Sequence, residues 1–243
     1  MLFRARKGQT SYGELIGILL LDTNTPFIHG DVGNAESYDY PVRFRRIDGL
    51  TPERIFAHDQ SFLQEMIHGA QELEREGVKA ITGDCGFMAI YQQEVQEAVH
   101  IPVFLTSLLQ IPIIAAMINP RSTIGIITSN AQSLDIHLFS HLGIADFQQI
   151  RIAGMEQHEA FRTAAIEDIG VLDSDQIRTE VVQTARALQS QNPDLGALLL
   201  ECSMLPPYAA AVHEATGLPV FDYLSMIDFV ASSVRKKTFI DSL

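Results

Sequence analysis

The only two cysteines of this 243-residue chain, Cys85 and Cys202, stand at matching places in two similar segments. Shifting the sequence by 117 residues aligns Cys85 with Cys202 and Tyr91 with Tyr208, and it also aligns two Pro-Val-Phe triplets. Self-similarity at a fixed offset indicates an internal repeat. Because both cysteines fall at one register of this repeat, we predict that they act as a pair.

Paired thiols in these positions suit proton transfer. Each cysteine follows an apolar run and precedes a helical pattern, as at the carboxyl end of a parallel strand, where open α/β sheets bind ligands. A helix N-terminus favours the thiolate and lowers the thiol pKa. If the strand ends of the two halves face each other, Cys85 and Cys202 lie on opposite faces of one substrate carbon. This arrangement predicts a cofactor-independent racemase or epimerase, an isomerase that uses the cysteines as two acid/base groups.

Alternating strand and helix patterns must position these cysteines. Continuous apolar runs are typical of parallel strands that are buried on both faces. The predicted strands are residues 15–21, 40–47, 78–82, 101–105, 123–128, 147–152, 195–200 and 220–223. The predicted helices are residues 51–76, 88–99, 133–142, 155–169, 174–191, 207–216 and 226–236. The alternation predicts an α/β fold with doubly wound parallel sheets and right-handed crossovers.

The segments around the cysteines resemble the aspartate/glutamate racemase superfamily, which includes hydantoin racemases, maleate isomerases and arylmalonate decarboxylases. The motifs that carry the resemblance are Gly83-Asp84-Cys85-Gly86, Glu201-Cys202-Ser203, Thr128-Ser129-Asn130, and the Ile-Pro-Val-Phe and Leu-Pro-Val-Phe strands. The resemblance implies two pseudo-symmetric domains, residues 1–105 with 223–243 and residues 106–222, with the site in the cleft between them. It also implies that the C-terminal helix crosses back to the first domain, that the cysteines are the acid/base groups, and that no cofactor is used.

The residues after the cysteines depart from the pattern of this superfamily. Its amino-acid racemases usually continue with Asn-Thr after the first cysteine and Thr-His after the second, whereas this chain has Gly86-Phe87 and Ser203-Met204. Phe87 and Met204 predict a more apolar pocket, and Gly86 leaves a backbone N–H open to a ligand oxygen. We therefore expect an amino acid or carbonyl compound other than glutamate or aspartate, such as a hydantoin-like one, as the substrate.

Short polar side chains follow the first strand of each half. The candidates for binding a substrate carboxylate or carbonyl are Asp22, Asn24, Thr25, Thr128, Ser129 and Asn130. Hydroxyl and amide donors stabilise charge that develops on an oxygen, but the same residue types make turns and helix caps. Asp84 and Glu201 need not reach the cleft, because adjacent strand residues point to opposite faces. If they do reach it, their charge raises the thiol pKa.

The bulk composition excludes several classes of function. A net charge of −13 without a cluster of Lys and Arg argues against nucleic-acid binding. The apolar runs are shorter than the ~20 residues that cross a bilayer, and no signal-peptide pattern follows the N-terminus. Two unpaired cysteines suit a reducing compartment. We expect a cytoplasmic protein whose partner is a small carboxylate or carbonyl substrate, and the charged fraction of 19% is compatible with a homo-oligomer.

Other functions stay open on the sequence alone. A decarboxylase, another lyase or a cis–trans isomerase of the superfamily would use one cysteine as nucleophile or sole proton donor. A protein that binds a small acid without catalysis would have its thiols blocked or too far apart to flank one carbon. His137 and His141 have the spacing of metal ligands on a helix, but no Glu adjoins them, so we predict a surface face and no metal site.

Overall fold

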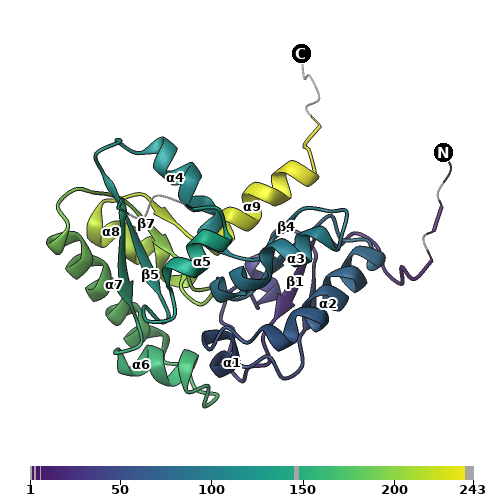
Figure 1. The fold of residues 1–243 in the computed structure, drawn as a ribbon, viewed down its shortest axis with the longest axis horizontal. Coiled ribbons are helices and arrows are strands. Elements are labelled where there is room, and N and C mark those ends of the chain that lie inside the picture. Colours follow the sequence, from purple (N-terminus) through teal and green to yellow (C-terminus); the bar gives the residue numbers. More distant parts are fainter. Residues whose placement is uncertain (1, 3, 6, 145–147, 239–243) are drawn as a thin grey trace.

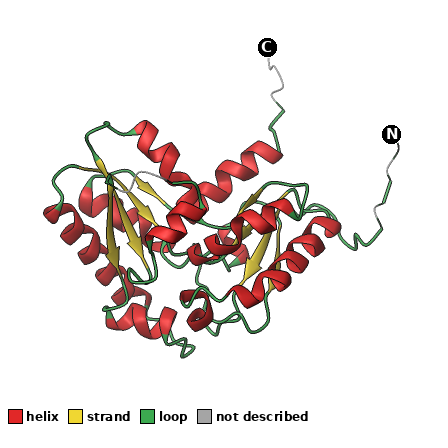
Figure 2. Cartoon of the chain, in the orientation of Figure 1, coloured by secondary structure: helices red, strands yellow, loops and turns green. Residues whose placement is uncertain are grey.

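The computed structural model describes residues 2, 4–5, 7–144 and 148–238. Within this part, two four-stranded sheets lie side by side with helices around them (Figures 1 and 2). The first sheet contains β1 (Ile16–Leu20), β2 (Val42–Arg46), β3 (Ala80–Gly83) and β4 (Val103–Phe104). The second contains β5 (Thr123–Thr128), β6 (Ile150–Gly154), β7 (Leu195–Leu200) and β8 (Val220–Phe221).

Both sheets have the same topology. The strand orders are β2-β1-β3-β4 and β6-β5-β7-β8, and every pairing is parallel. The eight strands that the sequence predicts are therefore confirmed, as is the α/β fold class, although Phe147 of the predicted strand 147–152 lies outside the described residues. Cys85 follows β3 and Cys202 follows β7, which are the third strands of their sheets, so the repeat inferred from the sequence corresponds to equivalent places in the fold.

The helices flank the two sheets. Those of the first half are α1 (Pro52–Phe56), α2 (Leu63–Glu76) and α3 (Gln92–Glu97). Those that follow are α4 (Ile111–Met117), α5 (Ile136–His141), α6 (Glu159–Phe161), α7 (Ser174–Gln191), α8 (Ala209–Thr216) and α9 (Tyr223–Val234). Short 3₁₀ turns, which include Gly86–Tyr91 and Ser107–Gln110, and one π turn at Arg162–Ile166 connect them. None of these helices combines the length and the apolarity that a membrane crossing requires.

Glycines on the central strands let one long helix approach each sheet closely. A Cβ atom on Gly17 of β1 would lie 2.9 Å from Leu73 of α2, and one on Gly125 of β5 would lie 2.9 Å from Leu188 of α7. A Cβ atom at either position would force the end of a leucine side chain to move, so glycine permits this close packing. The two sheets thus have a glycine at equivalent positions, and in each sheet it allows close packing of the long helix.

Helix α9 returns to the first sheet, as the resemblance implies. Asp222 caps the helix through a reciprocal capping box with Ser225. Tyr223 is fully buried and donates a hydrogen bond of 2.8 Å to the Leu105 carbonyl oxygen. Tyr223 and Ile227 pack with residues of β1 and β4 in one apolar cluster, and Figure 1 shows this helix in yellow between the lobes. The domain limits at residues 105/106 and 222/223 stay a prediction.

Three of the predicted helices are not continuous α-helices in the structure. The pattern over 51–76 breaks after α1, because His58 adopts a left-handed φ of 54° that no α-helix continues. Residues 88–99 begin as a buried 3₁₀ turn before α3, and 155–169 contain the π turn and only three α-helical residues. The helix α4 was not predicted, since its sequence reads simply as an apolar run.

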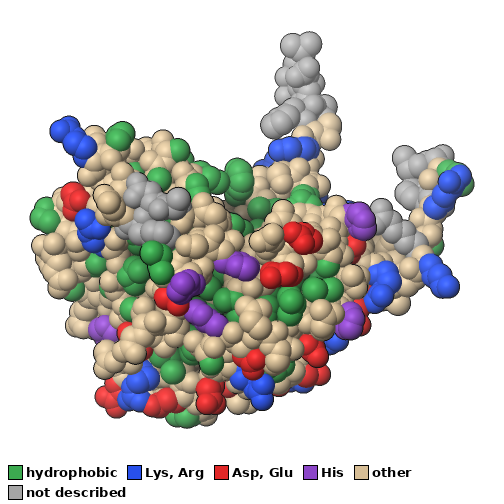
Figure 3. All heavy atoms as spheres, viewed as in Figure 1, with side chains coloured by type: hydrophobic (Ala, Val, Ile, Leu, Met, Phe, Trp, Pro, Cys, Tyr) green, Lys and Arg blue, Asp and Glu red, His purple; other side chains and the backbone are tan. Residues whose placement is uncertain are grey.

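Charged side chains are dispersed over the surface. Figure 3 shows Lys and Arg side chains standing apart from one another on one face, without a basic patch. His58, His137 and His141 line a cavity of about 150 Å³. Among the described residues, no group of three or more His, Cys, Asp or Glu is arranged to hold a metal ion, and His141 lies 3.5 Å from Glu94 instead.

Candidate active site

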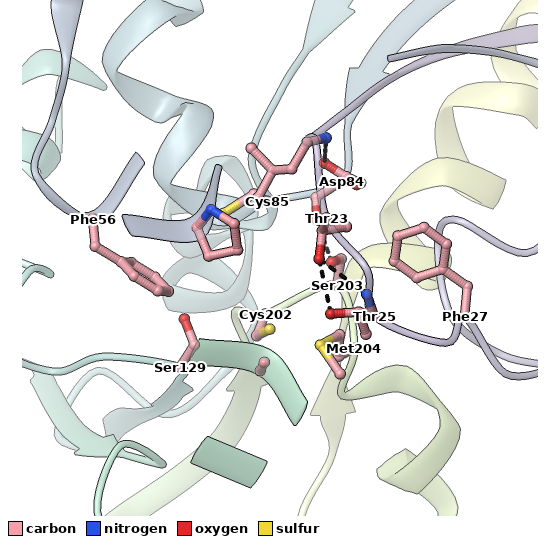
Figure 4. Close-up of a pocket in the computed structure, with 13 residues that line it drawn as sticks. Thr23, Thr25, Phe27, Phe56, Asp84, Cys85, Ser129, Cys202, Ser203 and Met204 are labelled. Carbon is pink, nitrogen blue, oxygen red and sulfur yellow. Dashed lines mark hydrogen bonds between the residues drawn. The ribbon is translucent and has the colours of Figure 1, made fainter. Parts of the chain in front are cut away.

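One small pocket lies between the lobes, where the loops after β1, β3, β5 and β7 meet (Figure 4). These strands flank the points at which each sheet order reverses, the usual ligand site of open α/β sheets. The lining residues are Leu21, Thr23, Thr25, Phe27, Pro52, Phe56, Asp84, Cys85, Ser129, Ala165, Cys202, Ser203 and Met204. The cavity volume is about 40 Å³, room for roughly three water molecules. In this closed state the pocket suits only a small molecule.

The two cysteines enter this pocket from opposite lobes, as predicted (Figure 4). Their side chains are buried, with exposed fractions of 8% for Cys85 and 9% for Cys202. Each begins a matching tight turn: the Met88 N–H donates to the Cys85 carbonyl oxygen, and the Leu205 N–H donates to that of Cys202, both at 3.0 Å. The pair thus shares one geometry in the two halves.

The prediction of lowered thiol pKa values was wrong. Burial raises the pKa of both thiols well above the usual value, and the negative charge of Glu201 raises it further. The backbone N–H groups of Phe87 and Met204 lower the pKa of Cys85 and Cys202 respectively, but by less. Cys85 is followed by a short buried 3₁₀ turn instead of a solvated α-helix, so desolvation outweighs the donors. Each cysteine is therefore a thiol in the resting protein.

Glu201 lies behind the pocket wall, close enough to both cysteines to affect their pKa, although strand alternation allowed it to point away. Its carboxyl group is fully buried, and its Oε2 atom accepts a hydrogen bond of 2.8 Å from the Thr128 hydroxyl. Across the lobe boundary the carboxyl group lies against Gly86, where a Cβ atom would be 1.5 Å from Oε1. Burial raises the pKa of Glu201 to about 7, while Thr128 and the Ser129 N–H lower it to a smaller extent.

Asp84 lines the pocket. Its Oδ1 atom accepts a hydrogen bond of 3.0 Å from the Leu21 N–H, and burial raises its pKa to about 7. Its backbone carbonyl oxygen accepts a hydrogen bond from the Ser203 hydroxyl of the other lobe. The two halves are therefore in contact beside the cysteines. Ser203 is hydrogen-bonded to Asp84, and Glu201 packs against Gly86.

Among the predicted substrate contacts, Ser129, Ser203, Met204 and Thr25 line the pocket. In Figure 4 the Ser129 hydroxyl points into the space between Phe56 and Cys202.

Three other predicted substrate contacts lie behind the residues that line the pocket. Thr128 binds Glu201, and Gly86 contacts the same carboxyl group. Phe87 is fully buried and packs edge-on against Phe56, with ring centroids 5.2 Å apart.

Asp22, Asn24 and Asn130 do not line the pocket and bond to other parts of the protein instead. Asp22 accepts a hydrogen bond of 2.8 Å from the Gly49 N–H. The backbone and side-chain amides of Asn24 bind Asp168. Asn130 accepts from two N–H groups of the turn that follows it, which is the turn-making role open to such residues.

The comparisons with known proteins identify the family. No family model matches the chain. Over 221 residues the chain is 34% identical to a dimethylsulfoniopropionate lyase from Durusdinium sp. clade D, an alignment that covers 88% of this chain and 73% of the relative. The chain belongs to the dimethylsulfoniopropionate lyase family. It is also 31% identical over 244 residues to dimethylsulfoniopropionate lyase 7 from Emiliania huxleyi, covering 92% of this chain and 68% of that protein.

A further member of the lyase family is longer than this chain. Dimethylsulfoniopropionate lyase 5 from Emiliania huxleyi is 33% identical over 228 residues, and the match covers 90% of this chain but only 45% of the relative. The chain thus spans less than half the length of that relative.

Solved structures confirm the superfamily fold. Unliganded arylmalonate decarboxylase superposes with a TM-score of 0.58 and 15% identity, covering 91% of this chain and 92% of the other. A glutamate racemase from Bacillus anthracis gives 0.59 and 17%, covering 91% and 81%. At these identities the likeness shows the fold alone, which is that of the aspartate/glutamate racemase superfamily.

The expectation of a racemase or epimerase, and hence of an isomerase, was wrong. The relatives that match in sequence are named lyases, which agrees with the alternative of a lyase built on the same superfamily fold. The superfamily resemblance predicted the architecture, and the sequence relatives correct the reaction class.

Several lining residues of this lyase-family pocket were missed by the sequence analysis. Phe56 and Pro52 come from α1, whose separation from α2 was not predicted. Ala165 comes from the π turn, and π turns are frequent at functional sites. Phe27 and Thr23 lie in the loop after β1, next to the candidates that were named. The sequence signal that could have identified Phe27 and Thr23 was that their loop follows the carboxyl end of a predicted strand.

Proposed function

We propose that this chain is a lyase that cleaves the carbon–sulfur bond of dimethylsulfoniopropionate, or of a close β-sulfonium carboxylate, by elimination. The observation that carries the proposal is the lining of the pocket: two thiols, hydroxyl groups and aromatic rings, with no Lys or Arg among its lining residues. The membership of the chain in the lyase family supports the same reaction class.

The pocket complements a substrate that brings its own positive charge. Dimethylsulfoniopropionate has a cationic sulfonium on C3 and a carboxylate on C1. Rings of Phe27 and Phe56 stand on opposite sides of the pocket (Figure 4), and aromatic faces attract cations. No cation of the described part of the chain balances the buried carboxyl groups of Asp84 and Glu201, and a sulfonium would supply one. A dicarboxylate would instead add negative charge to an acidic site.

The Ser129 hydroxyl provides a donor for the other end of the substrate. Ser129 lies on the loop after β5 and lines the pocket, whereas the Thr25 hydroxyl already donates to the Ala164 carbonyl oxygen. When a proton leaves C2, negative charge develops on the carboxylate oxygens, and fixed donors stabilise it.

The elimination requires one base. A thiolate of Cys85 or Cys202 takes the C2 proton, the C–H electron pair forms the C2–C3 double bond, and the C3–S bond breaks with its electron pair leaving on sulfur. The products are acrylate, dimethyl sulfide and a protonated thiol, which returns its proton to water. A thiolate of high pKa is a strong base, and the substrate cation lowers the cost of forming it inside the pocket.

The test is the release of dimethyl sulfide by the purified chain, measured by headspace gas chromatography with acrylate quantified in parallel. Because acid/base groups contribute about 10²–10⁴-fold, we expect Cys85→Ser or Cys202→Ser, whichever removes the base, to lower kcat by that factor. Ser190→Ala on the exposed face of α7 is the matched control and should leave kcat unchanged. Binding of dimethylsulfoniopropionate without release of dimethyl sulfide would refute the proposal and favour a binding protein.

A further inference from the structure

Glu201 is placed to act on both cysteines. It follows β7 and directly precedes Cys202 in the chain. Its carboxyl group crosses the lobe boundary to lie against Gly86, the residue that directly follows Cys85. The pocket-lining thiols thus have one carboxyl group as a common neighbour.

The two oxygens of this carboxyl group are in different environments. Oε2 accepts a hydrogen bond of 2.8 Å from the Thr128 hydroxyl. Oε1 is enclosed and has no hydrogen-bond partner among the described residues. A buried, unpartnered oxygen costs free energy unless it holds a proton to donate or meets a donor. Oε1 is therefore the atom at which this group gains and loses its proton.

Among the described residues, no cation offsets the charge of Glu201 at the thiols. The titratable groups that face it are Cys85 after β3, Cys202 on its own loop and Tyr223 of α9. After burial, Glu201 has the largest effect of any group on the pKa of both cysteines, ahead of Asp84. All of these groups become negative on ionisation, so each one opposes ionisation of the others.

We propose that Glu201 is a positioning residue shared by Cys85 and Cys202: the protonation state of its single carboxyl group decides how readily either thiol gives up its proton. With Oε1 protonated, the group is neutral and the thiolates are less disfavoured. With Oε1 ionised, its negative charge repels both thiolates. Because burial raises the pKa of Glu201 to about 7, this change falls near neutrality. The effect on turnover rests on the proposed lyase function, whereas the effect on the thiols does not.

The experiment measures thiol ionisation without substrate. The wild-type chain and Glu201→Gln are alkylated with iodoacetamide from pH 6 to pH 10, and the rate at each cysteine is read by peptide mass spectrometry. Glutamine keeps an acceptor for Thr128 and remains neutral at every pH. We expect alkylation of both cysteines to shift to lower pH by about one unit, which is about a tenfold faster rate at a fixed pH below the midpoint. Asp84→Asn is the matched control and should shift both cysteines less.

Unchanged alkylation rates at both cysteines in Glu201→Gln, or a faster rate at Cys202 alone, would overturn the proposal. If Glu201→Gln does not fold, Thr128→Val provides the second readout. Loss of the hydroxyl donor raises the pKa of Glu201, so the inflection near pH 7 in the alkylation profiles should move upward for both cysteines together. A chain with these shifts that releases no dimethyl sulfide would refute the lyase function and leave this inference standing.

Discussion

Replacing Gly86 with alanine should destabilise the protein through one specific collision. The new Cβ atom would lie 1.5 Å from Oε1 of Glu201 and 2.4 Å from its Cδ. Glu201 cannot move away freely, because it is fully buried and bound to Thr128. Overpacking costs about 1–3 kcal/mol, and loss of a hydrogen bond to a charged group costs about 1.5–3 kcal/mol. We therefore expect the free energy of unfolding to fall by roughly 3–5 kcal/mol.

Urea unfolding measures this change, followed by far-UV circular dichroism because the chain has no Trp. Gly69→Ala in α2 is the control: its Cβ would meet only the ends of the Leu19 and Ile47 side chains, at 3.0 Å, so a change below about 1 kcal/mol is expected. In a Glu201→Ala background, Gly86→Ala should cost less than about 1 kcal/mol, because the colliding atoms are gone. An equal cost in both backgrounds would refute the reasoning.

Three further predictions follow from the site. Burial raises the pKa of Asp84 and Glu201 to about 7, above their values in the unfolded chain, so the stability that they contribute is present below about pH 4 and is lost as the pH rises to about 7. Asp84→Asn should reduce the difference in unfolding free energy between pH 5 and pH 8 by on the order of 3 kcal/mol. Asp168 accepts hydrogen bonds from Thr23, which lines the pocket, and from the neighbouring Asn24. Asp168→Ala should lower the free energy of unfolding by about 1–3 kcal/mol and raise the iodoacetamide rate at both cysteines, and an unchanged rate would show that these bonds do not limit access to the pocket. Tyr223→Phe should cost about 1–2 kcal/mol in urea unfolding, because the buried Leu105 carbonyl oxygen loses its donor; a change within error would show that another donor replaces it.

The sequence predicts the strands and the pairing of the cysteines, because both depend on local patterns. The apolar runs of β5 and β7 match their predicted bounds, and a shared register places Cys85 and Cys202 after equivalent strands. The break between α1 and α2 could not be predicted, since it depends on a positive φ at His58 without a glycine to signal it.

The candidate site was predicted less completely. Phe56 and Ala165 line the pocket only because α1 and the π turn pack over the strand ends, a contact that no local pattern encodes. The thiol pKa was predicted with the wrong sign, because burial is a property of the assembled lobes. Glu201 was considered as a group that raises the thiol pKa, but whether its side chain reaches the thiols depends on the path of the chain after β7.

The enclosure of the two thiols has a consequence for chemical damage. Peroxides and other oxidants attack the thiolate, and sulfenic acid forms fastest at exposed cysteines of low pKa. Cys85 and Cys202 are nearly covered and are held as thiols by burial and by Glu201. Both thiols should therefore react slowly with oxidants. Oxidative stress should inactivate the protein slowly until a ligand or an opening of the lobes exposes the two cysteines.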